Sequence, residues 1–255
     1  MNRYQVLMLP GNVLPGGLAY GSLLKALGSD VDAVAKDLEV GAGSEAPGDY
    51  SLDIEVDGAL READARGWQR FHLVGYSGGG AAALALTARC PQRLWSLALL
   101  EPAWAGNWEW SPAQEALWAE YDRLQTLPPD QFMSAFIRLG VKPQASLPPP
   151  SLGEPPEWTA KRTTAIKAFL RTFKTYNLDR DALSRFRQPV YFALGGLTDP
   201  HEYGQVATTL ACVFPDFQLE VFAERHHFDP PHRTEPERLA RSLHATWARA
   251  QPGHV

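Results

Sequence analysis

This 255-residue chain lacks the features that mark several classes of protein. Its two cysteines, Cys90 and Cys212, are too few for a disulfide framework, and their apolar surroundings predict buried free thiols. No apolar stretch is long enough to span a bilayer, and the apolar part of the N-terminus is too short for a signal peptide. The net charge of -5, without a long basic run, argues against a nucleic-acid partner. Together these absences predict a cytoplasmic protein. The sequence makes no prediction about oligomeric state.

Short apolar runs alternate with helical patterns along most of the chain, without an internal repeat. The predicted strands are 5–9, 71–74, 94–100 and 190–194, with a weaker one at 31–38 and an alternating, edge-like one at 217–222. The predicted helices between them are 19–27, 51–67, 81–89, 202–213 and 234–250. Strands that are apolar throughout are buried on both faces. This order predicts an α/β fold with a mostly parallel sheet flanked by helices.

Residues 102–187 break this alternation, because they contain helical patterns and loops but no convincing strand. One helix is expected from Ser111, where serine, proline and a glutamine three residues after the serine form a helix start. Prolines between 143 and 156 predict a stiff loop before a last helix at 159–176. We therefore expect a core of residues 1–101 and 188–255 and a helical cap at 102–187. Such a cap would cover the carboxyl edge of the sheet, where open α/β sheets bind ligands.

The pentapeptide Gly75-Tyr76-Ser77-Gly78-Gly79 stands between a predicted strand and an alanine-rich helix. This is the context that a Gly-x-Ser-x-Gly nucleophile elbow requires. Glycine allows the sharp turn, so that Ser77 takes a strained conformation with an exposed hydroxyl. The backbone N–H of Gly78, at a helix start, would stabilise an oxyanion. The alternative is a glycine-rich turn with an incidental serine.

A serine hydroxyl needs a base to remove its proton and a carboxylate to orient that base. Asp199 directly follows the predicted strand 190–194, at the sheet edge where Ser77 is also expected. It is the predicted acid, and the alternative is a turn residue next to Pro200.

The predicted base is a histidine in the last loop of the chain. His226 and His227 are adjacent there, so only one of them is expected to face the serine, and His232 follows in the same loop. Phe228 would anchor the chain beside His227, which favours His227.

A second oxyanion donor is expected from the loop after the first strand. The Pro10-Gly11 pair leaves the backbone open to a ligand, so that the N–H of Asn12 could join that of Gly78. The alternative for this pair is a simple turn.

Several of these segments resemble those of the α/β-hydrolase family. The order Ser77, Asp199, His227 matches the Ser…Asp…His order of that family. Residues 37–44, 72–79 and 225–228 are similar to its glycine-containing segment, its elbow and its terminal histidine segment. The resemblance implies that His227 is the catalytic histidine and that the protein is a hydrolase without metal or cofactor. Serine in place of aspartate argues against the branches that cleave epoxides or carbon–halogen bonds.

We therefore predict a serine hydrolase that cleaves a small apolar carboxylic ester or related acyl compound through an acyl-enzyme. The substrate would be a small molecule in a pocket with Tyr76, Trp104, Trp108 and Trp118. Carbon–carbon bond hydrolysis, thioester hydrolysis and a lyase reaction use the same residues and stay open. So do a ligand-binding protein with little turnover and a scaffold without a small-molecule site.

Overall fold

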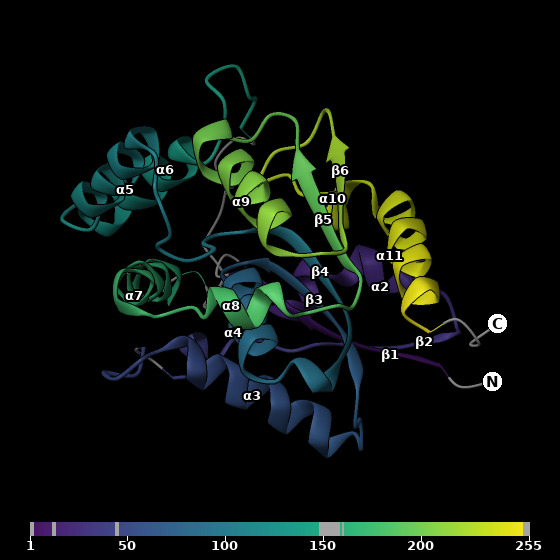
Figure 1. Cartoon of the computed structure of the whole chain (residues 1–255). Coiled ribbons are helices and arrows are strands. Elements are labelled where there is room, and N and C mark those ends of the chain that lie inside the picture. Colours follow the sequence, from purple (N-terminus) through teal and green to yellow (C-terminus); the bar gives the residue numbers. More distant parts are fainter. Residues whose placement is uncertain (1–2, 12–13, 44–45, 148–158, 160, 252–255) are drawn as a thin grey trace.

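A six-stranded, all-parallel sheet forms the centre of the computed structural model (Figure 1), which describes residues 3–11, 14–43, 46–147, 159 and 161–251. The strand order is β2-β1-β3-β4-β5-β6. The strands are β1 (Tyr4–Leu9), β2 (Val31–Ala35), β3 (Phe71–Ser77), β4 (Leu94–Pro102), β5 (Val190–Gly195) and β6 (Phe217–Phe222). The α/β fold with a parallel sheet is confirmed, including the edge position of β6.

Helices cover both faces of the sheet because alternate residues of the central strands are apolar on each face. One face packs against α3 (Leu52–Ala65), α4 (Gly78–Arg89), α8 (Arg180–Ser184) and α9 (Gln205–Val213). The other packs against α1 (Gly16–Ala19), α2 (Gly21–Ala26) and α11 (Pro236–Ala250), with α10 (Pro231–Thr234) beside α2 and α11. Short helical turns η1 (Glu39–Gly41), η2 (Pro91–Arg93) and η4 (Pro200–Gly204) complete these connections. The central strands β1, β3, β4 and β5 are therefore mostly buried, whereas the edge strands β2 and β6 are partly exposed.

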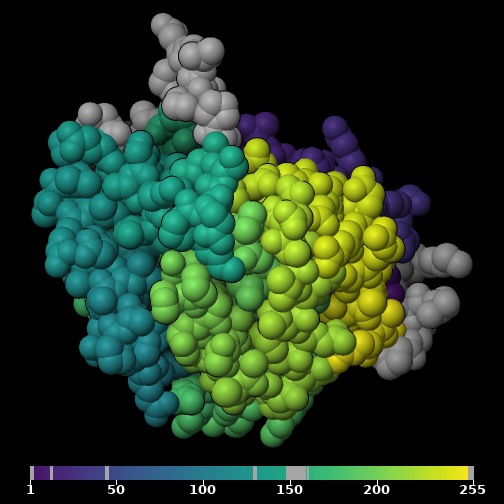
Figure 2. Space-filling model, turned by 90° about the horizontal axis from the view of Figure 1, so that it is seen from above, coloured from purple at the N-terminus to yellow at the C-terminus, as the bar shows by residue number. Residues whose placement is uncertain are grey.

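A helical insertion lies between β4 and β5, as predicted. It contains α5 (Pro112–Leu124), α6 (Pro129–Leu139) and α7 (Arg162–Thr175), followed by α8. Ser111 and Gln114 form the expected capping box at the start of α5. A small core of Tyr121, Leu124, Phe132, Ile166 and Leu170 joins α5, α6 and α7. In Figure 2 the teal helices α5 and α6 lie beside the green-to-yellow C-terminal part of the chain.

One expectation needs correction, and one helix was not expected. Cys90 and Cys212 are free thiols, but Cys90 is only half-buried and Cys212 is exposed, so the prediction that both are buried is wrong. The short helix α8 was not predicted, because its five residues carry too little pattern; Asp179 caps it by accepting the N–H of Ala182 at 2.9 Å. In the described part of the chain, each helix is too short or too polar to cross a bilayer.

Candidate active site

Ser77 is the last residue of β3 and has the strained backbone expected of an elbow. Its φ of 53° and ψ of -121° lie in a region that costs a non-glycine residue about 1–3 kcal/mol. A Cβ at Gly75 would lie 2.6 Å from the carbonyl oxygen of Gly79, and one at Gly80 would lie 2.7 Å from the Cα of Pro102. These glycines let β3, α4 and β4 pack closely enough to hold the bend.

His227 contacts the hydroxyl of Ser77 directly. Its Nε2 lies 3.0 Å from the Oγ of Ser77, and the residue is buried in the loop that follows β6. The imidazole stacks on the ring of Tyr203, with centroids 4.2 Å apart. The hydroxyl of Tyr76 donates a hydrogen bond to the carbonyl oxygen of His227. Ring and backbone are therefore both fixed, and of the two adjacent histidines it is His227 that the fold brings to Ser77.

The carboxylate beside this imidazole belongs to Glu101, at the end of β4. Its Oε2 lies 3.2 Å from the Nδ1 of His227. Its Oε1 accepts hydrogen bonds from the N–H of Gly195 at 2.7 Å and the hydroxyl of Thr198 at 2.6 Å. Glu101 is buried, and both of its carboxylate oxygens have hydrogen-bond partners. A buried, hydrogen-bonded carboxylate can orient a neighbouring imidazole.

A bulge in β4 directs Glu101 toward the histidine. Tyr76 pairs with Leu100, whereas Ser77 pairs with Pro102, so Glu101 is an extra residue with a φ of 45°. Bulges of this kind turn a side chain out of its regular alternation and occur next to active sites.

Asp199 lies just after β5, as predicted, but its carboxylate has other partners, so the expectation that it orients the histidine is corrected. Its Oδ1 accepts the N–H groups of His201 at 2.9 Å and Glu202 at 3.1 Å, so it caps η4. Glu101 lies at the end of β4 and Asp199 lies just after the neighbouring strand β5, so strand position alone did not separate them. The signal that could have found Glu101 is an acidic residue directly after the apolar run 97–100.

The two other histidines of the last loop have other partners. The Nε2 of His226 lies 3.2 Å from the carbonyl oxygen of Ser146, and its Nδ1 accepts the N–H of Phe228 at 3.1 Å. His226 therefore links this loop to the segment that follows α6 in the helical insertion. His232 is buried between the rings of Tyr20 and Tyr76, and this burial lowers its pKa to about 3.

Of the two predicted oxyanion donors, one lies within the described residues. Gly78 is the first residue of α4, next to Ser77, whereas Asn12 lies outside the described residues. The segment before Asn12 packs tightly on the elbow. The N–H of Gly79 donates to the carbonyl oxygen of Pro10 at 3.0 Å, and a Cβ at Gly11 would lie 3.0 Å from that of Ser77.

Two pockets lie between the sheet edge and the helical insertion. The serine pocket, about 450 Å³ and partly open to solvent, is lined by Ser77, Gly78, Trp118, Tyr121, Glu202 and Phe228 among others. The tryptophan pocket, about 390 Å³, is lined by Trp104, Trp108, Trp110, Trp118 and Glu202 among others.

The predicted pocket residues are divided between these spaces. Trp118 lines both pockets, whereas Trp104 and Trp108 line the tryptophan pocket. Trp104 also stacks on Phe173, with centroids 5.2 Å apart. Tyr76 lines neither of these two pockets, and its side chain is buried beside His227.

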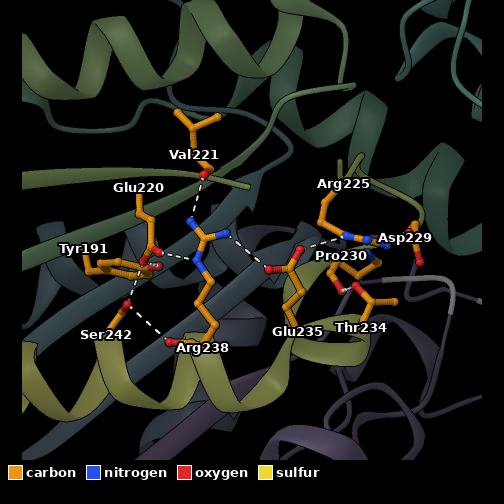
Figure 3. A network of polar contacts seen from close by, with 10 residues as sticks. All are labelled: Tyr191, Glu220, Val221, Arg225, Asp229, Pro230, Thr234, Glu235, Arg238 and Ser242. Carbon is orange, nitrogen blue, oxygen red and sulfur yellow. Dashed lines mark hydrogen bonds and ion pairs between the residues drawn. The ribbon is translucent and has the colours of Figure 1, made fainter. Parts of the chain in front are cut away.

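A network of ion pairs holds the loop that carries His227 (Figure 3). Arg225 and Asp229, which lie on either side of His227 in the chain, form an ion pair at 2.7 Å. Arg225 also contacts Glu235, at the start of α11, at 2.9 Å. Arg238 continues the network to Glu235 at 3.2 Å and to Glu220 of β6 at 2.8 Å. The loop is thus fastened to a helix and a strand of the core.

The sheet, the elbow after β3 and the insertion after β4 together define an α/β-hydrolase fold. The sequence matches the alpha/beta hydrolase family over residues 6–242, and the chain belongs to this family. It matches none of the curated proteins with which it was compared.

Solved structures with similar folds include several hydrolases. A hydrolase from Pseudomonas aeruginosa PA01 has a TM-score of 0.68 at 19% identity, over 96% of this chain and 89% of that one. A thermophilic esterase from Thermogutta terrifontis has a TM-score of 0.69 at 19% identity, over 98% and 91%. The meta-cleavage product hydrolase from Pseudomonas fluorescens IP01 has a TM-score of 0.66 at 17% identity, over 98% and 92%. At such identities the likeness concerns the fold, and the chain is a hydrolase in the broad sense of its family.

Proposed function

We propose that this protein is a serine hydrolase of small, mainly apolar carboxylic esters, in which Ser77 is the nucleophile, His227 the base and Glu101 the orienting acid. The observation that carries the proposal is the continuous hydrogen-bonded chain from the Oγ of Ser77 through both nitrogens of His227 to Glu101. A base that is held on its far side by a carboxylate keeps the tautomer that accepts the serine proton.

The reaction would proceed through an acyl-enzyme. Nε2 of His227 takes the hydroxyl proton as Ser77 attacks the ester carbonyl, and the same proton then passes to the leaving alcohol. Water repeats these steps on the acyl-enzyme, releasing the acid and restoring Ser77. Backbone N–H groups of Gly78 and Asn12 are the proposed oxyanion donors. Loss of one such donor typically lowers turnover by about 10²–10³.

The walls of the serine pocket support an apolar substrate. Phe169, Leu170, Phe173 and Phe228 line it beside Ser77. We include residues 102–187 in the proposal as a cap that supplies part of this wall. The free thiols of Cys90 and Cys212 fit a reducing, cytoplasmic location. The fold also occurs in the meta-cleavage product hydrolase, so a carbon–carbon substrate belongs in the same assays as esters and thioesters.

A fluorophosphonate probe tests the proposal directly, because it reacts only with an activated serine. We expect labelling of the wild type and none of Ser77→Ala or His227→Ala, with His226→Ala as the matched control that retains labelling. Turnover of an ester panel of increasing acyl length then tests the bond type. A folded wild type that neither takes up the probe nor hydrolyses any ester would contradict the proposal.

A further inference from the structure

Glu202 places a buried carboxyl group in the wall of both pockets. Glu202 is a lining residue of the serine pocket and of the tryptophan pocket, and it is 6% exposed. The hydroxyl of Tyr121 donates a hydrogen bond to its Oε2 at 2.7 Å. In the part of the chain that the structure describes, none of the ion pairs includes Glu202. The role assigned above to Ser77, His227 and Glu101 leaves Glu202 unused.

The groups around Glu202 make its negative charge costly. Burial comes first, and the nearby carboxylates of Asp199 and Glu101 add to it, so the pKa of Glu202 is raised to about 8. Hydrogen bonds from Tyr121 on α5 and Tyr203 on η4 act in the opposite direction. His201 lines the tryptophan pocket on the same turn. A buried carboxylate is stabilised when a cation comes within contact distance.

The remaining walls suit such a cation. Trp118 lines both pockets, and Phe136, Phe173 and Phe228 line the serine pocket. The faces of aromatic rings attract cations, and this attraction grows when water is excluded. A ligand group that meets Glu202 therefore has a carboxyl on one side and aromatic rings around it. These surroundings favour a protonated amine over an alkyl group of the same shape.

We propose that Glu202 binds a protonated amine on the substrate, so that the preferred substrates are esters with a basic nitrogen on the group that occupies the serine pocket. This inference rests on the proposed function, since Ser77 and Glu202 line the same pocket. It adds to that function a substrate class, amino esters, and a specificity-determining residue.

Matched pairs of esters test this preference. One pair differs in the alcohol, 2-(dimethylamino)ethyl butanoate against 3-methylbutyl butanoate. The other differs in the acyl group, ethyl 4-(dimethylamino)butanoate against ethyl 5-methylhexanoate. In at least one pair we expect the wild type to prefer the amine by about tenfold or more in kcat/KM. Glu202→Gln should lose this preference, whereas Asp122→Asn, which removes a carboxylate from the exposed face of α5, should keep it.

A binding measurement makes the test independent of turnover and of the folding of the Glu202 variant. Calorimetry of Ser77→Ala with the amino esters, in two buffers of different ionisation enthalpy, counts the protons released. Because the carboxyl of Glu202 is mostly protonated at neutral pH, pairing with an amine should release about one proton per ligand. Tighter binding of the amine with this proton release supports the inference even if no ester is turned over.

The two proposals can fail separately. Hydrolysis of amine and isostere at equal rates by the wild type, with equal binding and no proton release, would overturn the role of Glu202 and leave the hydrolase intact. Absence of hydrolysis and of fluorophosphonate labelling, with proton-releasing amine binding retained, would overturn the hydrolase and leave an amine-binding pocket.

Discussion

Glu101 and His227 lie 126 positions apart in the chain, yet Oε2 of one is 3.2 Å from Nδ1 of the other. The contact joins the end of β4 to the loop after β6, across the end of β5. Gly195, the last residue of β5, and Thr198, just after it, donate hydrogen bonds to the other oxygen of Glu101. The end of β5, where the acid was predicted, thus supplies hydrogen-bond donors to Glu101, and the carboxylate itself comes from β4.

Replacing each of the two candidate acids by its amide separates their roles. Glu101→Gln should lower kcat by about 10³–10⁴, because the imidazole loses the carboxylate that fixes its tautomer. Asp199→Asn, its matched control, should retain most activity and change the free energy of unfolding by about 1 kcal/mol or less, because asparagine also caps helices. Ester hydrolysis and urea unfolding measure both effects. The reverse ranking of the two variants in kcat would return the acid role to Asp199.

The close approach at Gly75 predicts that the elbow does not accept a side chain. Gly75→Ala would place a Cβ 2.6 Å from a backbone oxygen and 2.8 Å from the Cβ of Ala83, so we expect a loss of about 1–3 kcal/mol or more. Gly17→Ala is the control, because a Cβ there meets no atom within 4 Å. Urea unfolding of both variants measures the difference. Equal stability of the two would mean that the elbow packs less tightly than described.

Arg225 is expected to act as a positioning residue for His227. Arg225→Gln breaks its pairs with Asp229 and Glu235, so the loop should hold the imidazole less firmly and kcat should fall by about threefold to tenfold. The stability change should be small, about 1 kcal/mol or less, because these pairs are partly exposed.

Arg249→Gln controls for the loss of an arginine that is paired with Asp216 away from this loop. The rate of fluorophosphonate labelling is the readout, since labelling requires Ser77 to be activated by a correctly held His227. An unchanged labelling rate in Arg225→Gln, or an equal decrease in Arg249→Gln, would rule out the positioning role.

The raised pKa of Glu202 predicts how stability depends on pH. Its pKa is about 8 in the folded protein and about 4.5 when exposed, so between these values the folded state holds a proton that the unfolded state has released. The contribution of Glu202 to the free energy of unfolding should therefore be fully present below pH 4.5 and be lost as the pH rises through 8. Relative to Glu202→Gln, the wild type should lose up to about 1.4 kcal/mol per pH unit in this window. Urea unfolding at several pH values measures the slopes, and parallel slopes would contradict the prediction.

Most of the fold could be predicted because its signals are local. Continuous apolar runs marked the buried strands, and the serine–proline–glutamine start of α5 marked a helix of the insertion that the structure confirms. The conformation at Ser77 was also predictable, since glycines within three residues decide whether the chain can turn there. The helix α8 was missed because five residues carry too little pattern.

Sequence alone determined the succession of strands and helices along the chain, the bend at Ser77 and the loop that holds the histidines. Each of these features depends on neighbouring residues. Only the tertiary structure decided which carboxyl group meets His227. Glu101 lies at the end of β4 and Asp199 follows β5, and the choice between them depends on a one-residue bulge in β4 and on the cap that Asp199 forms with η4. The burial of Glu202 was decided in the same way, since it requires α5 to fold back over the sheet edge and bring Tyr121 to its carboxyl.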